Sequence, residues 1–272
     1  MSDQSAQPTP YPEVNAVLNV LLPEVQAILG NQFIGMYLIG SLASGDFDQS
    51  SDVDCVVVTE AELSETHFSA LQDMHTRIAR IDSWCATQLE GSYIPQPALR
   101  RYDPVRALYL HIDRGRDERL HRMQLANPDL SRAWWGGWVI LRSNLWECGI
   151  TLAGPAPQTM IDPVTPDDLG QATLAVLHGW AAQILVDPAQ MDGHGYQSYV
   201  VLTLCRMLYT LEYGLLVSKL VAARWAQAVL GEPWRSLIER AWLGRQNPGV
   251  QAAPEDVNGT LDFIRYTLEH CQ

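Results

Sequence analysis

Residues 36–58, which read MYLIGSLASGDFDQSSDVDCVVV, constrain the fold and the chemistry of this chain more than any other segment. A short apolar run ends in Gly40 and Ser41, and after ten further residues Asp52 and Asp54 stand at the start of a second apolar run. Short apolar runs that are bounded by turn residues are typical of buried β-strands. Because successive side chains of a strand point to opposite faces, we expect Asp52 and Asp54 to share one face, about 7 Å apart.

Two carboxylates on one face at the edge of a sheet offer the hard oxygen ligands that Mg²⁺ prefers. The Gly-Ser turn can bring backbone N–H groups and a hydroxyl close to a phosphate, since glycine tolerates a tight approach. A lone Asp-x-Asp is common at solvated strand ends. The complete pattern is more specific, because it combines a strand, Gly-Ser, a fixed spacing, Asp-x-Asp and a second strand. It predicts phosphoryl or nucleotidyl transfer, and it resembles the signature of the DNA polymerase β-like nucleotidyltransferase superfamily.

Length and charge narrow the class of protein. A chain of 272 residues can form one large domain or two smaller ones, and its 47% hydrophobic content is ordinary for a globular protein. The net charge of −13 argues against a general nucleic-acid binder, because binding to phosphate backbones depends on Lys and Arg. An acidic protein favours a cationic partner, although acidity also serves solubility alone.

The sequence favours a cytoplasmic protein. No apolar run reaches the length of a membrane span, and residues 1–12 lack a signal-peptide pattern and are expected to form a flexible lead-in. The five cysteines are scattered without a Cys-x-x-Cys pair, which indicates neither a disulfide framework nor a zinc site. We expect a monomer in a reducing compartment, with no membrane and no nucleic acid as partner.

Apolar periodicity predicts the elements of the first half of the chain. We expect helices over residues 13–29 and 64–80, and strands over residues 33–39, 52–58 and 86–94. In the third strand Glu90 shares a face with Gln88 and Ser92, so Glu90 can add a third carboxylate on the side of the Asp pair.

Residues 96–127 are rich in arginine that alternates with acids. Such a segment can contact a triphosphate, or it can be an ordinary solvated surface. The arginines are Arg100, Arg101, Arg106, Arg114, Arg116, Arg119 and Arg122. An apolar helix is expected over residues 134–147, followed by a turn and domain junction at residues 154–157.

The remainder of the chain predicts a helical bundle without strands. The expected helices cover residues 166–186, 197–213, 218–230, 234–243 and 254–269. The fold class is therefore α+β, with a mixed sheet and helices in the first domain. We predict a lead-in at residues 1–12, a nucleotidyltransferase domain at 13–157 and a helical domain at 158–272.

The C-terminal half resembles the aminoglycoside adenylyltransferases that modify streptomycin and spectinomycin. The segments that carry the resemblance are TLAGPAP (151–157), IDPVTPDDL (161–169), VVLTLCRMLYTLEYG (200–214), SKLVAARWA (218–226) and IERAWLG (238–244). The resemblance covers about residues 33–95 and 150–270, whereas residues 96–149 match less well.

This resemblance implies ATP as co-substrate, bound between the two domains, with two Mg²⁺ ions on its phosphates. Asp52 and Asp54 would be the metal ligands, and Glu90 would be the general base that takes the proton from the acceptor hydroxyl. The residues implied near the phosphates are Gly40, Ser41, Ser51, Arg206 and Lys219. Glu90 can instead be an ordinary strand-end acid, and Arg206 can instead form a structural ion pair with an acid such as Glu212.

The chain departs from the family at the acceptor. Tyr196 stands where the family has an acidic residue that contacts the streptomycin cation, and Asp192 can replace that residue only if the loop shifts. The aromatic segment 134–138 can shape the acceptor pocket, although core packing is the simpler role for its tryptophans. The histidines have no metal-ligand spacing.

The leading hypothesis is Mg²⁺-dependent transfer of AMP from ATP to a hydroxyl of a cationic aminoglycoside or aminocyclitol antibiotic, which releases pyrophosphate and confers resistance. A second hypothesis keeps this chemistry and assigns another small molecule or a protein hydroxyl as the acceptor. A third is a catalytically silent nucleotide-binding module. Retention of Asp52, Asp54 and Glu90 argues against the third hypothesis, because clustered carboxylates repel one another without a metal.

Overall fold

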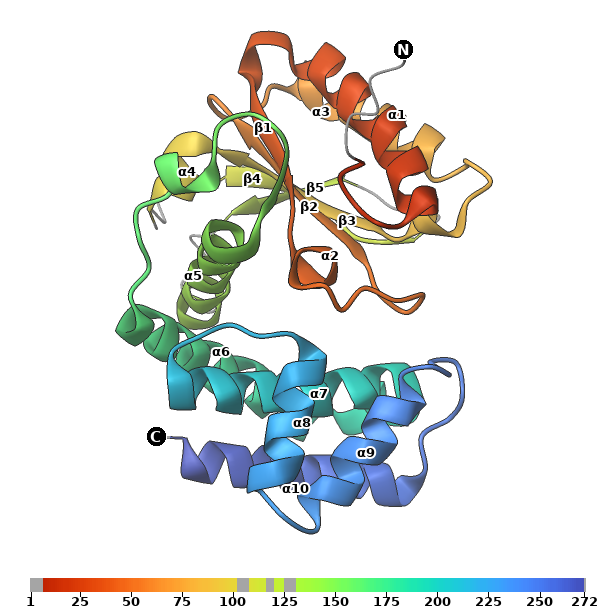
Figure 1. The fold of residues 1–272 in the computed structure, drawn as a ribbon, viewed down its shortest axis with the longest axis vertical. Coiled ribbons are helices and arrows are strands. Elements are labelled where there is room, and N and C mark those ends of the chain that lie inside the picture. The colour runs from red at the N-terminus through yellow and green to blue at the C-terminus, as the bar shows by residue number, and fades with distance from the viewer. Residues whose placement is uncertain (1–6, 102–107, 116–119, 125–130, 272) are drawn as a thin grey trace. The chain divides into compact units, whose positions relative to one another are not determined.

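The computed structural model describes residues 7–101, 108–115, 120–124 and 131–271, and the chain divides into two compact units (Figure 1). The first unit takes in the described parts of residues 1–127 and 144–163. The second takes in the described parts of residues 128–143 and 164–272.

The first unit is built on a six-stranded mixed sheet. Its strands are β1 (Phe33–Leu38), β2 (Val53–Thr59), β3 (Leu89–Pro95), β4 (Leu108–Ile112), β5 (Leu120–Gln124) and β6 (Ile150–Ala153), in the order β5-β4-β3-β2-β1-β6. Strands β2 and β3 run parallel, and the other neighbouring pairs are antiparallel. The helices of this unit are α1 (Pro12–Leu29), α2 (Gly40–Ser44), α3 (Glu65–Ile78) and α4 (Gln96–Arg100).

Helices α1 and α3 cover one face of this sheet (Figure 1). Ser64 begins α3 as predicted, because its hydroxyl accepts the backbone N–H of His67 at 3.3 Å. Apolar residues of both helices join one buried core with residues of β1, β2 and β3. Burial of this face is the main source of stability for a sheet-and-helix layer.

The pleat of the strands decides which residues point away from α1 and α3, toward the other face of the sheet. Cys55 and Val57 of β2 and Leu89 and Tyr93 of β3 belong to the core under α1 and α3. Side chains alternate along a strand, so the residues between them point to the opposite side of the sheet. Polar side chains at those positions therefore do not disturb the core.

Three strands were not predicted. β4 and β5 lie in the arginine-rich segment, and β6 directly precedes the expected turn at residues 154–157. Such short strands carry too few apolar residues for a clear period of two, and pairing with a longer neighbour decides their conformation. The third strand begins at Leu89 and not at Ala86, because residues Trp84–Thr87 form a 3₁₀ turn. Arg106, Arg116 and Arg119 lie outside the described residues.

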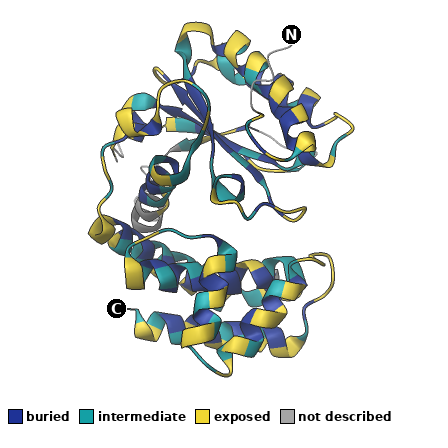
Figure 2. Ribbon diagram, viewed as in Figure 1, coloured by how far each residue is buried: buried dark blue, intermediate teal, exposed yellow. Residues whose placement is uncertain are grey.

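The second unit is helical, as predicted. Its helices are the first part of α5 (Ser131–Cys148), then α6 (Pro166–Val186), α7 (His194–Tyr213), α8 (Lys219–Val229), α9 (Trp234–Gly244) and α10 (Pro254–His270). Residues of α6 to α10 form one buried apolar core, and the exposed residues lie on the outer faces of the helices (Figure 2). Thr165 and Asp168 cap the start of α6 reciprocally, and Ser218 caps α8. Among the described residues, α6 alone has the length and composition of a membrane span, but it packs into this core.

Candidate active site

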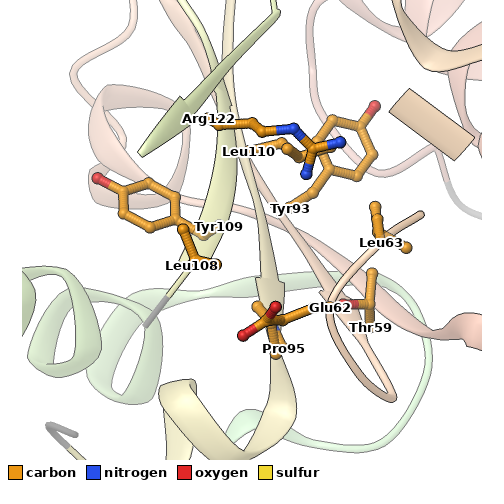
Figure 3. Close-up of a pocket in the computed structure, with 9 residues that line it drawn as sticks. All are labelled: Thr59, Glu62, Leu63, Tyr93, Pro95, Leu108, Tyr109, Leu110 and Arg122. Carbon is orange, nitrogen blue, oxygen red and sulfur yellow. The ribbon is translucent and has the colours of Figure 1, made fainter. Parts of the chain in front are cut away.

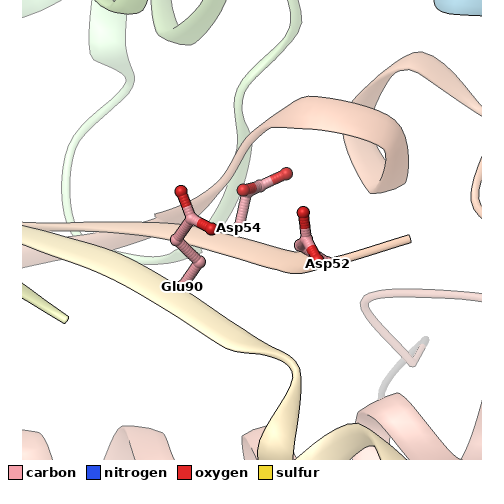
Figure 4. Close-up of side chains that lie close together, drawn as sticks. All are labelled: Asp52, Asp54 and Glu90. Carbon is pink, nitrogen blue, oxygen red and sulfur yellow. The ribbon is translucent and has the colours of Figure 1, made fainter. Parts of the chain in front are cut away.

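The carboxylates of Asp52, Asp54 and Glu90 form a cluster at the start of β2 and β3. One oxygen from each lies within 4.8 Å of the oxygens from the other two, and all three residues are half-buried. Figure 4 shows the three side chains pointing to the same side of the two strands. The structure therefore brings together the two predicted metal ligands and the predicted base.

The parallel register of β2 and β3 explains why Glu90 joins the cluster. Asp54 pairs directly with Glu90, so their side chains leave the sheet on the same face. Asp52 directly precedes β2, where the N–H of Val53 donates to the carbonyl of Gln88 at 2.7 Å. That bond begins the ladder and keeps Asp52 beside the other two carboxylates.

Gly40 lies against Asp54, and its lack of a side chain is a steric requirement of the site. Its φ of 64° is in the left-handed region, and a Cβ built on it would lie 2.9 Å from Cγ of Asp54 and overlap Oδ2. The N–H of Ile39 donates to the carbonyl of Asp54 at 3.1 Å, and the N–H of Gly40 donates to Oδ1 of Asn144 at 3.2 Å. Asn144, in α5, had no signal in the sequence that pointed to this position.

The two predicted phosphate-side serines are in different situations. The hydroxyl of Ser41, on the first turn of α2, is buried and has no hydrogen-bond partner among the described residues. A buried hydroxyl without a partner is costly, so it is suited to a bound ligand. The hydroxyl of Ser51 accepts the N–H of Asp48 and donates to its carboxylate, both at 3.1 Å. Ser51 thereby holds the turn that leads into Asp52.

Arg114 also contacts the cluster. It lies two residues beyond Ile112, where β4 ends, and its guanidinium donates to Oδ1 of Asp52. In the sequence, Arg114 is one of seven arginines of the arginine-rich segment, and no local pattern distinguishes it from the others. Only the antiparallel pairing of β4 with β3 carries it to the carboxylates.

The cysteine inside the motif is not a nucleophile. Burial raises the pKa of the Cys55 thiol to about 12, and the nearby carboxylates of Asp54 and Glu90 contribute to this rise. A thiol with such a pKa stays protonated at neutral pH. The side chains of the motif that can bind a metal or accept a proton at neutral pH are therefore its carboxylates.

The predicted cationic residues, Arg206 and Lys219, lie in the second unit. Arg206 is half-buried on α7, and Lys219 is the first residue of α8. The ammonium of Lys219 lies 5.2 Å from the ring centroid of Tyr199, a distance typical of a cation–π contact. Both cations thus lie on helices of the second unit.

Residue 196, where the resemblance implies an acidic acceptor contact, is a tyrosine in this chain. The ring of Tyr196 stacks on that of Tyr199, with centroids 5.9 Å apart. Asp192 is exposed, and its carbonyl accepts the N–H of Ala252 at 2.7 Å. Trp138 is buried as core packing requires, whereas the side chains of residues 134 and 135 lie outside the described residues.

Two further hollows lie away from the carboxylates. One has a volume of about 20 Å³ and lies at the opposite end of β2, between Thr59, Tyr93 and Arg122, as Figure 3 shows. That volume suits a water molecule and not a nucleotide. The other, of about 660 Å³, lies among α6, α7, α8 and the end of α10, and neither Arg206 nor Lys219 lines it.

Chemically, the cluster offers three oxygen donors at the start of β2 and β3, beside a buried hydroxyl and a glycine that leaves room. Half-buried carboxylates so close together repel one another unless a cation lies among them. Oxygen donors at this spacing fit a divalent hard cation such as Mg²⁺.

Comparison with known proteins agrees with the two-unit organisation. The family model described as "Nucleotidyltransferase domain" matches residues 20–109, and "Aminoglycoside adenylyltransferase, C-terminal domain" matches residues 159–270. An aminoglycoside (3'') (9) adenylyltransferase of Escherichia coli is 25% identical over 260 residues, which cover 93% of this chain and 94% of that protein. A spectinomycin 9-adenylyltransferase of Staphylococcus aureus is 28% identical over 257 residues, which cover 90% and 91%.

A solved structure shares the fold over most of this chain. It is the crystal structure of the spectinomycin adenyltransferase AAD(9) from Enterococcus faecialis with ATP and spectinomycin. The TM-score is 0.68 at 16% identity, and the match covers 93% of this chain and 98% of that one. At this identity the likeness supports the fold.

Proposed function

Because this chain belongs to the aminoglycoside adenylyltransferase family of nucleotidyltransferases, we propose that it transfers AMP from ATP to a hydroxyl of an aminoglycoside or aminocyclitol antibiotic. Pyrophosphate is the second product, and modification of the antibiotic confers resistance. The observation that carries this proposal is the cluster of Asp52, Asp54 and Glu90 in a chain that matches both family models. Relatives that cover more than nine-tenths of the chain carry this activity in their names.

Asp52 and Asp54 would hold Mg²⁺ in this proposal, and two ions would be bound in the complete complex. The bound metal would supply charge stabilisation on the triphosphate and on the leaving pyrophosphate. The donor set supports this role, because Mg²⁺ takes carboxylate oxygens in preference to nitrogen or sulfur. Gly40 keeps the carboxylate of Asp54 free of a steric clash.

Glu90 acts as the general base in the proposed reaction. It accepts the proton of the acceptor hydroxyl, while that oxygen forms a bond to the α-phosphorus and the bond to pyrophosphate breaks. A carboxylate suits this role when it lies within hydrogen-bond reach of the hydroxyl. Its register opposite Asp54 supports the assignment, since the base must lie beside the metal-bound phosphate.

Ser41 and Ser51 of the first unit would also contact the phosphates, and the resemblance assigns a triphosphate contact to Arg206 and to Lys219, which lie in the second unit. The buried hydroxyl of Ser41 supports its part, because it has no hydrogen-bond partner among the described residues. Ser51 contributes at least the turn before Asp52. Cations on two helices suit a triphosphate, since charge-assisted hydrogen bonds to phosphate are strong.

A second candidate keeps the reaction and changes the acceptor. Tyr196 stacks on Tyr199 where the resemblance places an acid for the streptomycin cation. Two stacked rings favour an acceptor with an apolar or cationic face over one that needs a carboxylate at this point. We therefore rank spectinomycin-like aminocyclitols above streptomycin, and another small molecule or a protein hydroxyl below both.

The test is a pyrophosphate-release screen with ATP or GTP, Mg²⁺ and a panel that includes streptomycin and spectinomycin. Mass spectrometry of the acceptor should show the gain of one AMP. The Asp54→Asn variant is the negative control, which measures the pyrophosphate release that does not depend on the proposed metal site. Release that depends on a protein acceptor, or no release from a folded preparation that binds ATP, would overturn the antibiotic assignment.

All five cysteines are free thiols, which supports a reducing cytoplasm as the site of action.

A further inference from the structure

The guanidinium of Arg114 binds one of the carboxylates that are proposed to hold the metal. Its Nη1 donates to Oδ1 of Asp52, and both side chains are partly exposed. The N–H of Gly115 donates to the carbonyl of Thr87 at 3.0 Å, so the backbone next to Arg114 is tied to the turn that precedes β3. The backbone beside Arg114, two residues beyond the end of β4, is thus fixed against the turn before β3.

The neighbouring acid faces another way. The carboxylate of Asp113 lies 3.4 Å from Nε2 of His111 and 3.6 Å from Nε2 of His121. Adjacent residues at the end of β4 therefore separate their charges, with Asp113 turned to the histidines and Arg114 turned to Asp52. This arrangement places a cation, and not a fourth carboxylate, against the metal ligands.

A divalent cation bound by Asp52 would compete with Arg114 for the same carboxylate. Three carboxylates within 4.8 Å of one another need a counter-charge, and the guanidinium provides one while no metal is bound. A metal ion on the same carboxylate would lie within a few ångströms of the guanidinium, where like charges repel strongly at the effective dielectric of a protein surface. Metal binding must therefore release Arg114, or must wait until another anion receives it.

We propose that Arg114 is a built-in counter-ion, which the metal displaces from Asp52 and which the triphosphate then receives. This inference rests on the proposed function, because it needs a metal at Asp52 and a triphosphate beside it. A guanidinium binds phosphate oxygens at least as well as carboxylate oxygens, in bidentate geometry. Arg114 thereby couples the two ligands: free metal binds weakly, and metal together with ATP binds well.

The experiment measures binding of Mn²⁺ in place of Mg²⁺ by electron paramagnetic resonance, with and without a non-hydrolysable ATP analogue. In Arg114→Gln we expect the affinity for Mn²⁺ alone to rise about tenfold, because a like charge is removed from the site. We also expect the analogue to enhance Mn²⁺ binding less than in the wild type, because the proposed coupling between the two ligands runs through Arg114. The Tm of the metal-free protein should fall, since the cluster loses its counter-charge.

Arg122→Gln is the matched control. Arg122 lies in β5, which pairs with β4, and its guanidinium binds the carboxylate of Glu65 at 2.8 Å. It should leave Mn²⁺ affinity and its enhancement by the analogue unchanged. Arg114→Lys guards against a folding defect, because it keeps the charge and should keep free-metal affinity low.

Different results would overturn the role of Arg114 and the metal site of the proposed function. Mn²⁺ affinity in Arg114→Gln that equals or falls below that of wild type overturns the role of Arg114. If Asp54→Asn binds Mn²⁺ as tightly as the wild type does, the metal site itself fails, and with it the proposed function. Loss of Mn²⁺ binding in Asp54→Asn, together with tighter binding in Arg114→Gln, supports both.

Discussion

Gly40 and Asp54 lie so close together across the turn after β1 that no side chain larger than hydrogen fits at residue 40 without moving the carboxylate. The backbone of Gly40 has a positive φ, which also favours glycine. The glycine of the Gly-Ser pair is therefore required by the carboxylate site as much as by the turn. This contact joins the two ends of the motif that predicts nucleotidyl transfer.

Gly40→Ala should reduce activity and metal binding much more than it reduces stability. The positive φ costs about 1–2 kcal/mol for a residue with a Cβ, and the overlap is relieved by swinging the Asp54 carboxylate aside. Gly45→Ala is the control, because Gly45 also has a positive φ (80°) and a Cβ added there would meet no atom within 4 Å. Thermal unfolding should shift alike in both variants, and only Gly40→Ala should lose Mn²⁺ affinity. Equal Mn²⁺ affinity in the two variants would contradict the steric argument.

Asp54→Asn should lower the rate of pyrophosphate release by about 10³-fold or more, because metal stabilisation of transition-state charge amounts to several kcal/mol. The substitution keeps the shape of the side chain and removes its charge, so circular dichroism should remain that of the wild type. Chelation with EDTA should silence the wild type, and added Mg²⁺ should restore it. Asp73→Asn, at an exposed position on α3, serves as the control. An active, EDTA-resistant Asp54→Asn enzyme would refute the metal role.

Glu90→Gln separates a base from a ligand. If Glu90 is the base, turnover should fall about 10²- to 10⁴-fold, with the affinity for Mn²⁺ and ATP nearly unchanged. The acidic limb of the pH–rate profile should also disappear, because that limb reports protonation of the base. A large loss of Mn²⁺ affinity would assign Glu90 to the metal instead, which its position in the cluster also permits.

Lys219→Gln should weaken ATP binding while the acceptor KM changes little, because the proposed partner of Lys219 is the triphosphate. Loss of one charge-assisted hydrogen bond corresponds to about 1.5–3 kcal/mol. The measurement is calorimetric titration with the non-hydrolysable ATP analogue. Arg224→Gln provides the matched control, since Arg224 is an exposed cation on the same helix. Equal ATP affinity in the two variants would remove Lys219 from the nucleotide site.

His75 should make the first unit lose stability as pH falls from about 6.5, the ordinary histidine pKa. Burial lowers the pKa of His75 to about 4, and its Nε2 lies 2.7 Å from the hydroxyl of Tyr93. The unfolded chain then takes up the proton more readily than the folded one, so this contribution is complete above pH 6.5 and is lost toward pH 4. The loss amounts to about 3 kcal/mol.

Urea unfolding at several pH values, followed by a probe in the first unit, measures this effect. His75→Gln can keep a hydrogen bond to Tyr93 and should flatten the decline between pH 6.5 and pH 4. His178→Gln, at an exposed position on α6, should retain the wild-type slope. An unchanged slope in His75→Gln would show that other groups cause the acid sensitivity.

Local signals predicted most of the fold. The first two strands and the long helices of both units have long apolar periods or strong caps, such as Ser64 before α3 and Ser218 before α8. Strands β4, β5 and β6 were not predicted, because strands of four or five residues are formed by pairing with neighbours and not by their own pattern.

The sequence by itself determined that Asp52 and Asp54 share one face, since the side chains of a strand alternate with a period of two wherever that strand lies in the sheet. Glu90 was predicted from the same alternation, but only the parallel register opposite Asp54 decided that its carboxylate meets theirs. Arg114 and Asn144 reach the site through contacts across 62 and 104 residues of chain, and no local pattern encodes such contacts. Short-range periodicity thus selected the ligands, and tertiary pairing decided which charges and amides surround them.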